Sequence, residues 1–215
     1  MRVAALYDVH GMPWALEAVL AEVDADAIVF GGDLVWGPYP RETLELIRSL
    51  DAVVVRGNAD RDLGEWVTAQ LSDEDRRWLL QLPQTHVLDD VFYCHATPRS
   101  DEEIITPETS HEELEEMLAG VEQRLVVGGH THMQQRRGRY VNPGSVGMPY
   151  EDDVAAFWAV ISDDVEFRRT LFDVEEAIAQ TLHSGWPLAQ SFVDENLAQA
   201  PSRSEAIAQF RPAGT

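Results

Sequence analysis

The sequence predicts an α/β fold with parallel strands at its centre. Short apolar runs of strand length alternate three times with amphipathic stretches of helical length within residues 1–82. Each apolar run ends in a loop that contains glycine or a polar residue before the helical pattern begins. Because parallel strands need a crossover connection, usually a helix, this alternation indicates the fold class.

Three strand–helix units make up this part of the chain. The first strand contains residues 3–7, and Pro13 opens a helix whose apolar residues recur at helical spacing up to residue 23. Ser72 and Asp75 have the spacing of a capping box, which predicts a break in the third helical stretch. The other two units comprise expected strands at residues 27–30 and 52–55, followed by helical sequence at residues 40–50 and 62–82.

The remaining sequence favours antiparallel pairs and one further buried strand. Residues 125–127 form a short apolar run, and Ser110 begins a helix that extends to about residue 119. Without an internal repeat or a linker, residues 1–215 are expected to form one domain, with C-terminal helices from about residue 173 and a short polar tail. The expected pairs join residues 84–88 to 91–94, 133–137 to 139–141 and 154–162 to 165–172, and the last helices cover residues 173–183 and 188–198.

Composition narrows the classes of function. Thirty-eight acidic residues against sixteen basic ones give a formal charge of -22, which repels nucleic-acid polymers. Cys94 is the single cysteine, so a metal site must use nitrogen and oxygen donors. The sequence has neither an apolar run long enough to span a membrane nor a signal-peptide pattern, so we expect a cytoplasmic protein that does not bind membranes.

Residue types that bind metals follow five of the expected strands, close to the point where each strand ends. In α/β sheets, the carboxyl edge is where binding and catalytic sites are built. Singly, Asp33 could be a turn residue, Asn58 a loop residue and His95 a buried core histidine. Their joint placement favours one shared site. In the order of the five strands, the candidates are Asp8 with His10, Asp33, Asn58, His95, and His130 with His132.

The number of donors favours two metal ions. Three carboxylate or amide oxygens and four imidazoles exceed the three or four protein ligands of a single catalytic ion, but suit two ions that share a carboxylate. Two ions about 3.5–4 Å apart can clamp a phosphoryl group and deprotonate a bridging water. Their positive charge would also attract a phosphate to an acidic protein.

These residues fall into motifs that resemble, in order and across residues 1 to about 150, those of the calcineurin-like metallophosphoesterases: Asp8-x-His10-Gly, Gly32-Asp33-Leu-Val, Gly57-Asn58-x-Asp60, His95 after a strand, and Gly129-His130-x-His132. The stretch Gly32–Pro38 and the stretch Asn142–Gly147 are most similar to the small bacterial and archaeal phosphodiesterase group. The Asp-Arg-Gly stretch of protein phosphatases and dinucleoside tetraphosphatases is missing. The resemblance implies a four-layer αββα sandwich of two mixed β-sheets flanked by helices.

The resemblance also implies a dimetal-dependent phosphoesterase, and a phosphodiesterase rather than a monoesterase. It would hydrolyse a phosphate ester by in-line attack of a hydroxide that bridges the metals. Asp33, Asn58 and His95 would take part in catalysis by holding the metals that carry this hydroxide. Manganese is expected first, although iron, nickel, zinc and cobalt suit the same donors. The implied ligands are Asp8, His10 and His132 for one ion, and Asn58, His95 and His130 for the other, with Asp33 bridging.

Two positions depart from the family pattern. Ala59 stands where a histidine usually follows the asparagine of the third motif. Loss of a general acid lowers the rate by about 10²–10⁴ for a poor leaving group, so we expect weak activity on alkyl monoesters and better activity on activated aryl diesters. Met12 replaces the usual asparagine after the first motif, which affects a contact that orients the phosphate or a ligand.

Other residues have two interpretations each. Asp60 either holds a ligand or loop in place or caps a helix. Trp36 and Tyr39 could line a substrate cleft or serve only in packing. Arginines beside acids often form surface ion pairs, but three of them lie in or beside the motif loops and are candidates for substrate phosphate: Arg56, Arg61 and Arg99.

The expected substrate is a small phosphorylated molecule or a nucleotide. Apolar surface on the late antiparallel pair or the C-terminal helices could also build a homo-oligomer. Alternative functions are a catalytically weak or inactive metal-binding scaffold and a nucleotide sensor of the same fold. Retention of all seven candidate ligands favours the enzyme.

Overall fold

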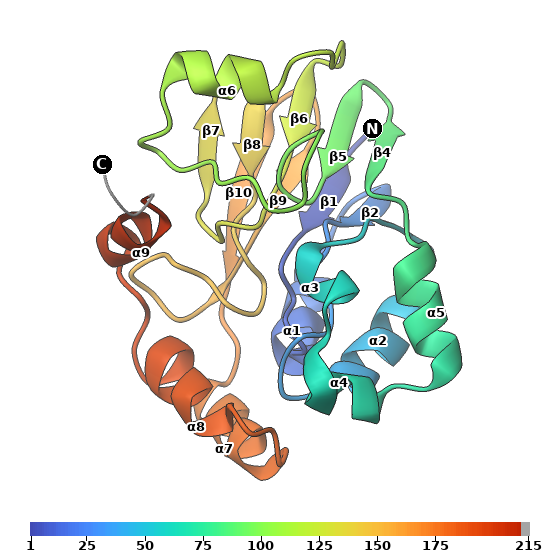
Figure 1. Ribbon diagram of the computed structural model, residues 1–215, viewed down its shortest axis with the longest axis vertical. Helices are drawn as coiled ribbons and strands as arrows, with labels where there is room; N and C mark the ends of the chain where they lie inside the picture. Colours follow the sequence, from blue (N-terminus) through green and yellow to red (C-terminus); the bar gives the residue numbers. More distant parts are fainter. Residues whose placement is uncertain (212–215) are drawn as a thin grey trace.

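The computed structural model describes residues 1–211 and contains two five-stranded sheets (Figure 1). The strand orders are β10-β9-β1-β2-β3 and β4-β5-β6-β8-β7. The first sheet comprises β1 (Val3–Leu6), β2 (Ala27–Phe30), β3 (Ala52–Val54), β9 (Ala156–Ile161) and β10 (Val165–Thr170). The second comprises β4 (Thr85–Leu88), β5 (Val91–Cys94), β6 (Leu125–Val127), β7 (Gln135–Arg137) and β8 (Tyr140–Asn142).

Helices connect the strands and complete the chain. Five of them lie between β1 and β4: α1 (Pro13–Glu22), α2 (Pro40–Arg48), α3 (Asn58–Arg61), α4 (Gly64–Gln70) and α5 (Asp73–Gln81). The later helical segments are α6 (His111–Met117), α7 (Val174–His183), α8 (Ala189–Phe192), the π-helical turn η1 (Val193–Leu197) and α9 (Arg203–Phe210). Within residues 1–211, every helix is too short or too polar to cross a membrane.

Both sheets have parallel strands at the centre and antiparallel strands at an edge. In the first sheet β1 pairs with β2 and β2 with β3 in parallel, and the β9–β10 pair adds antiparallel strands. In the second sheet β5, β6 and β8 are parallel, while β4 and β7 are antiparallel edge strands. The antiparallel pairs β4–β5, β7–β8 and β9–β10 are those that the sequence predicts.

Alternation along β1 shows how the sheets stack. Val3 and Ala5 belong to an apolar cluster with residues of the second sheet, such as Tyr93 and Val127, so these side chains lie between the two sheets. The intervening residues of β1 face the opposite side because successive strand residues point to opposite faces. The middle layer of core is therefore made by both sheets.

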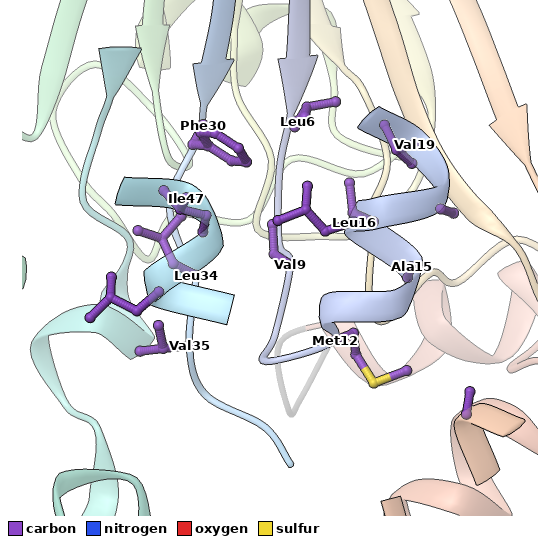
Figure 2. Close-up of a cluster of buried hydrophobic side chains, with 14 of the residues drawn as sticks. Leu6, Val9, Met12, Ala15, Leu16, Val19, Phe30, Leu34, Val35 and Ile47 are labelled. Carbon is purple, nitrogen blue, oxygen red and sulfur yellow. The ribbon is translucent and has the colours of Figure 1, made fainter. Parts of the chain in front are cut away.

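Helices cover the two outer faces. Leu6 of β1 and Phe30 of β2 pack with Leu16 and Val19 of α1 and Ile47 of α2 (Figure 2). On the other side, α6 covers the second sheet through a separate cluster of apolar residues: Cys94, Ile105, Leu114, Leu118, Val126 and Tyr140. Three layers of core therefore separate four layers of secondary structure, which confirms the αββα sandwich.

Two predictions for the C-terminal part need correction. The expected short polar tail contains α9, whose N-cap Ser202 accepts a hydrogen bond from the backbone N–H of Glu205 at 3.1 Å. Ala206 of this helix is buried, and Ile207 and Phe210 are partly buried, so apolar side chains anchor the helix. The single helix expected at residues 188–198 is α8 followed by η1. The break at Ser72, by contrast, is confirmed, and Ser72 caps α5.

Candidate metal centre

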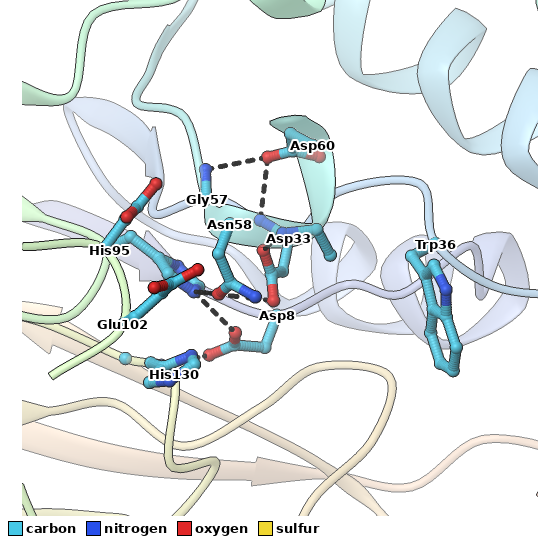
Figure 3. A network of polar contacts seen from close by, with 12 residues as sticks. Asp8, Asp33, Trp36, Gly57, Asn58, Asp60, His95, Glu102 and His130 are labelled. Carbon is cyan, nitrogen blue, oxygen red and sulfur yellow. Dashed lines mark hydrogen bonds and ion pairs between the residues drawn. The ribbon is translucent and has the colours of Figure 1, made fainter. Parts of the chain in front are cut away.

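The seven predicted ligands lie together, on loops that follow five strands. Asp8 and His10 follow β1, Asp33 follows β2 and Asn58 follows β3 in the first sheet. His95 follows β5, and His130 and His132 follow β6 in the second sheet. Both sheets therefore contribute side chains to one site at the carboxyl ends of their parallel strands (Figure 3).

Donor atoms converge in two groups that share a carboxylate. In each group, one ligand atom per residue lies within 4.8 Å of all the others. Asn58 adjoins the second group, because its Oδ1 lies 3.0 Å from His95 Nε2. Asp33 is the residue common to the two groups, which are Asp8, His10, Asp33 and His132, and Asp33, His95 and His130.

The two carboxylates are held in the same way. Asp8 Oδ2 accepts a hydrogen bond from the backbone N–H of His130 at 3.1 Å, and Asp33 Oδ1 accepts one from Ala59 at 2.8 Å. The second oxygen of each faces the imidazoles: Asp8 Oδ1 lies 3.4 Å from His132 Nε2, and Asp33 Oδ2 lies 3.5 Å from His95 Nε2. Asp8 Oδ1 is buried without a hydrogen-bond partner. A buried oxygen of this kind, among imidazole nitrogens, fits a divalent cation.

Three imidazoles are oriented by backbone carbonyls. The Nδ1 atoms of His10, His95 and His132 lie 3.2, 2.8 and 2.6 Å from the carbonyl oxygens of Trp36, Gly31 and Met148. A proton on each Nδ1 would donate to these carbonyls, which leaves Nε2 directed into the site. His10 Nε2 and His132 Nε2 lie only 3.2 Å apart. This is the arrangement that orients histidines for metal coordination through Nε2.

The protonation states also suit cation binding. Burial alone would raise the pKa of Asp8. The charge of His132, the hydrogen bond between His132 and Asp8, and the charge of His95 outweigh burial, so the pKa of Asp8 is lowered. The pKa of Asp33 is lowered for the same reason by His95 and His10, against the effect of burial. Burial lowers the pKa of His10 and of His130 to about 4. At neutral pH the site therefore holds two carboxylates and neutral imidazoles at His10 and His130.

The backbone of the site is unusual. Within the described chain, seven non-glycine residues have positive φ, and five of them are candidate ligands. The left-handed region is unfavourable for such residues, at a cost of about 1–3 kcal/mol each, and occurs mainly at functional sites. The other two are Asp89 and Asp152, and the five ligands are Asp8, His10, Asp33, His130 and His132.

Asp60 ties the loops after β2 and β3 together. Its carboxylate accepts backbone hydrogen bonds from Asp33 at 2.9 Å, Leu34 at 2.8 Å and Gly57 at 2.9 Å (Figure 3). Burial and the charge of Asp33 raise its pKa to about 7. The geometry supports the interpretation of Asp60 as a residue that holds a ligand loop. Asp60 is the third residue of α3, and because its carboxylate accepts the backbone N–H of the N-cap Gly57, it also takes part in capping this helix.

Glycine is required where the backbone passes the carboxylates. A Cβ at Gly129 would lie 2.6 Å from Asp8 Oδ2, and one at Gly57 would lie 2.1 Å from Asp33 Oδ1. A side chain at either position would displace a candidate ligand. Asn142 holds this region from outside the metal motifs, because its Nδ2 donates to the carbonyl of Gly129 at 2.8 Å.

The predicted arginines are placed differently from one another. Arg61 lines the cavity at the site, but neither Arg56 nor Arg99 does. Arg56 donates from Nη1 to the backbone carbonyl of Leu80 at 2.9 Å, and Arg99 pairs with Glu103 at 2.8 Å. Only Arg61 therefore lies in position to meet a substrate in this cavity.

The cavity has a volume of about 430 Å³. Aromatic side chains form part of its lining, and only one of them was identified from the sequence. Trp36 lines it, as one of its two interpretations predicts. Tyr39 instead packs edge-on against Trp14 and donates its hydroxyl to the carbonyl of Gln180 at 3.1 Å. Sequence reasoning missed Asp62, Glu102, Met148, Tyr150 and Phe210. Tyr150 and Phe210 lie outside the metal motifs, so no local signal marked them.

Comparisons with known proteins concern the family and the fold. Residues 1–163 match the model of the calcineurin-like phosphoesterase superfamily domain. A crystal structure of a metallophosphoesterase from Sphaerobacter thermophilus is 30% identical, with a TM-score of 0.80 over 93% of this chain and 99% of that chain. A hypothetical protein from Pyrococcus horikoshii has the same fold at 21% identity, with a TM-score of 0.79 over 93% of this chain and 99% of that chain.

A curated relative adds no activity of its own. It is an uncharacterized protein of Methanocaldococcus jannaschii, 24% identical over 86% of this chain and 93% of its own length. The family model covers most of the chain and includes all seven candidate ligands, from Asp8 to His132. The chain therefore belongs to the calcineurin-like phosphoesterase superfamily.

Proposed function

We propose that the protein is a phosphodiesterase that depends on two divalent metal ions. The observation that carries this proposal is the position of Asp33, which belongs to both groups of converging donors. One ion would bind Asp8, His10 and His132, and the other Asn58, His95 and His130, with Asp33 between them. Nitrogen and oxygen donors of this kind suit manganese, and also iron, nickel, zinc or cobalt.

The chain's own residues prepare the site for phosphoryl transfer. When bound, two such ions supply Lewis acidity to a phosphoryl group and a nucleophile at neutral pH. Asp60 fixes the backbone of Asp33, so the shared carboxylate cannot shift as charge develops. Ala59 lines the cavity and carries no group that donates a proton to a leaving group. Leaving groups that depart without protonation, such as activated aryl oxides, are therefore favoured.

Charge at the cavity favours a diester over a monoester. Arg61 is the single arginine among the lining residues that the structure describes, and lysine is not found there. Its guanidinium already contacts Glu102 at 2.8 Å and Asp101 at 3.3 Å. The carboxylates of Asp62 and Glu102 line the same cavity. A phosphodiester carries one negative charge and a monoester nearly two at neutral pH, so these carboxylates repel the monoester more strongly.

Hydrolysis of bis-p-nitrophenyl phosphate tests the proposal. Metal-stripped protein should be inert and should regain turnover when manganese, nickel, zinc or magnesium is added. Asp33→Asn should lower turnover by at least about 10²-fold, because it removes the charge shared by both ions. Asp62→Asn, which changes an exposed carboxylate of the same cavity, is the matched control and should stay active. p-Nitrophenyl phosphate should be hydrolysed more slowly than the diester.

The same experiment separates the alternatives. Metal binding without turnover for any added ion would contradict the enzyme and favour the scaffold or the nucleotide sensor. All seven candidate ligands lie in one site, which favours the enzyme, because a scaffold that only binds metal does not need the complete set of donors for two ions. We further propose that the substrate is small, since the overall charge of -22 opposes nucleic-acid polymers.

A further inference from the structure

Three aromatic side chains line the cavity that also contains His10, His130 and His132. They come from three separate segments of the chain. Trp36 lies in the loop between β2 and α2, Tyr150 in the loop between β8 and β9, and Phe210 at the end of α9. We call Trp36, Tyr150 and Phe210 the aromatic cleft.

The rings adjoin the candidate metal ligands directly. Tyr150 stacks on His132, with ring centroids 4.9 Å apart and an interplanar angle of 27°. Phe210 follows at 6.2 Å from Tyr150. Trp36 meets His10 edge-on at 5.8 Å, and Figure 3 shows its ring on the side of Asp8 away from His95. A group attached to a phosphoryl at the metal centre would therefore meet aromatic faces.

Trp36 is held in place by the C-terminal part of the chain. Its ring packs edge-on against Trp186 at 5.2 Å, and Trp186 in turn packs against Phe192 at 5.3 Å. Trp186 is only 5% exposed. The carbonyl of Trp36 also faces His10 Nδ1 at 3.2 Å. The ring is therefore positioned before a substrate arrives, which lowers the entropic cost of binding.

Phe210 is held through the start of its helix. Arg203 at the beginning of α9 donates to the carboxylate of Glu151 and to the carbonyl of Gln134, each at 2.8 Å. Its backbone N–H donates to Asp152 Oδ1 at 3.0 Å. These contacts fix α9 against the loop that carries Tyr150. The two rings thus form one surface although about sixty residues separate them in the sequence.

The cleft offers apolar faces rather than cations. The side chains of Trp36, Tyr150 and Phe210 are uncharged at neutral pH, since a phenol ordinarily ionises only near pH 10. Arg61, on another part of the cavity wall, is paired with Asp101 and Glu102. A second phosphate would find no unpaired arginine or lysine among the described lining residues. A flat, uncharged ring is the group that fits this surface, because aromatic faces stack on one another.

We propose that the aromatic cleft selects phosphodiesters in which one organic group is a flat aromatic ring, held against Tyr150 and Phe210. The ring belongs to an aryl group or to a nucleobase, which present the same stacking face. This inference rests on the proposed diesterase function. It assigns to α9, a helix outside the residues that match the family model, the role of a specificity element.

Competitive inhibition tests the proposal with phosphodiesters that carry at most one ring each. Dimethyl phosphate, methyl phenyl phosphate and the methyl ester of thymidine 5′-phosphate each carry one negative charge and differ in one organic group. They are compared as inhibitors of bis-p-nitrophenyl phosphate hydrolysis by the metal-loaded, full-length protein. The inhibition constant of a ring-bearing ester should be about tenfold lower than that of dimethyl phosphate, the effect of one stacked ring. The ring-bearing ester with the lower inhibition constant shows whether the cleft prefers an aryl group or a nucleobase.

Variants connect the preference to the cleft. Phe210→Ala and Tyr150→Leu should each bring the inhibition constants of the ring-bearing esters closer to that of dimethyl phosphate. Phe167→Ala is the matched control, because Phe167 is an exposed phenylalanine of β10 outside the cavity. Equal inhibition by all three esters, or a ratio that neither variant changes, would overturn the inference.

Calorimetric binding separates this inference from the proposed function. Titration of methyl phenyl phosphate and dimethyl phosphate into metal-loaded protein measures ring selection without turnover. Preferential binding of methyl phenyl phosphate without hydrolysis of any diester would contradict the proposed phosphodiesterase activity but support ring selection by the aromatic cleft. Hydrolysis without ring preference would contradict the cleft alone.

Discussion

His95 differs from the other histidines of the site in its charge. Burial alone would lower its pKa, but the charges of Asp33 and Asp8 and a hydrogen bond to Asp33 raise it to about 10. His10 and His130 have pKa values of about 4, which burial lowers. Without metal, His95 therefore carries the positive charge that balances the carboxylates. A metal ion that binds Nε2 must displace this proton.

Metal binding should therefore release a proton from His95 and strengthen with pH. At pH 7.5 we expect His95 to release about one proton, in addition to the one lost by a water that becomes the metal-bound nucleophile, and an affinity that rises at least about tenfold per pH unit up to the pKa of His95. Calorimetric titration of stripped protein with manganese, in buffers of different ionisation enthalpy, measures the number released. His95→Asn should lower the number of protons released by about one. Three protons would contradict the neutral state of His10 and His130, and none would contradict the charge on His95.

The same pKa shift affects stability in the absence of metal. The raised pKa of His95 contributes stability that is complete below its unfolded value of 6.5 and is lost as pH rises through about 10. The lowered pKa values of His10 and His130 act in the opposite direction. Their contribution is present above 6.5 and is lost as pH falls through about 4. These histidines therefore favour the folded, metal-free state most near pH 6.5.

Among the elements, the loops after β2 and β3 depend on Asp60. Its carboxylate accepts three backbone hydrogen bonds from these loops. Asp60→Ala would leave buried N–H groups unsatisfied, and each costs about 1–3 kcal/mol. We expect the free energy of unfolding to fall by about 3 kcal/mol or more and turnover to fall about 10²-fold, because Asp33 and Asn58 shift. Denaturant unfolding and diester hydrolysis measure the two effects.

Asp62→Ala is the control for this prediction. Asp62 lies two residues away and is exposed, so its loss should change stability by less than about 0.5 kcal/mol. Asp60→Asn keeps the size of the side chain but replaces one acceptor oxygen with a donor, and should lie between the two. Similar stability of Asp60→Ala and the unmodified protein would show that the loops are held by other contacts.

At the scale of the whole molecule, the metal centre joins the two sheets. Asp8, His10, Asp33 and Asn58 follow strands of the first sheet, and His95, His130 and His132 follow strands of the second. Bound ions would therefore link the sheets at one end of their shared core. Their positive charge would neutralise the two neighbouring carboxylates, and the free energy of metal binding would offset the cost of the positive φ angles of the ligands.

Metal removal should lower the free energy of unfolding. An ion at 100 times its dissociation constant stabilises the folded state by about 2.7 kcal/mol. Thermal unfolding with and without a chelator measures the effect. Asp33→Asn should remove more of this stabilisation than His10→Asn, because Asp33 belongs to both donor groups and His10 to one. Equal metal-induced stabilisation in the two variants would contradict a shared Asp33.

Much of the site could be predicted from short stretches of sequence. Asp8 follows an apolar run directly, and Asp33 and Asn58 each follow one after two residues, so their place near a strand end is a local property. The stacking of two sheets could not be predicted from periodicity, since all four residues of β1 are apolar and buried and suit either partner. The resemblance to a family supplied that step.

The sequence by itself determined the alternation of strands and helices, the capping box at Ser72 and the seven donors at the strand ends, because each is written within a few consecutive residues. Only the tertiary structure decided which arginine faces the cavity, and that Tyr150 and Phe210 meet beside His132. These contacts join segments far apart in the chain. They depend on how α9 docks through Arg203, which no local pattern encodes.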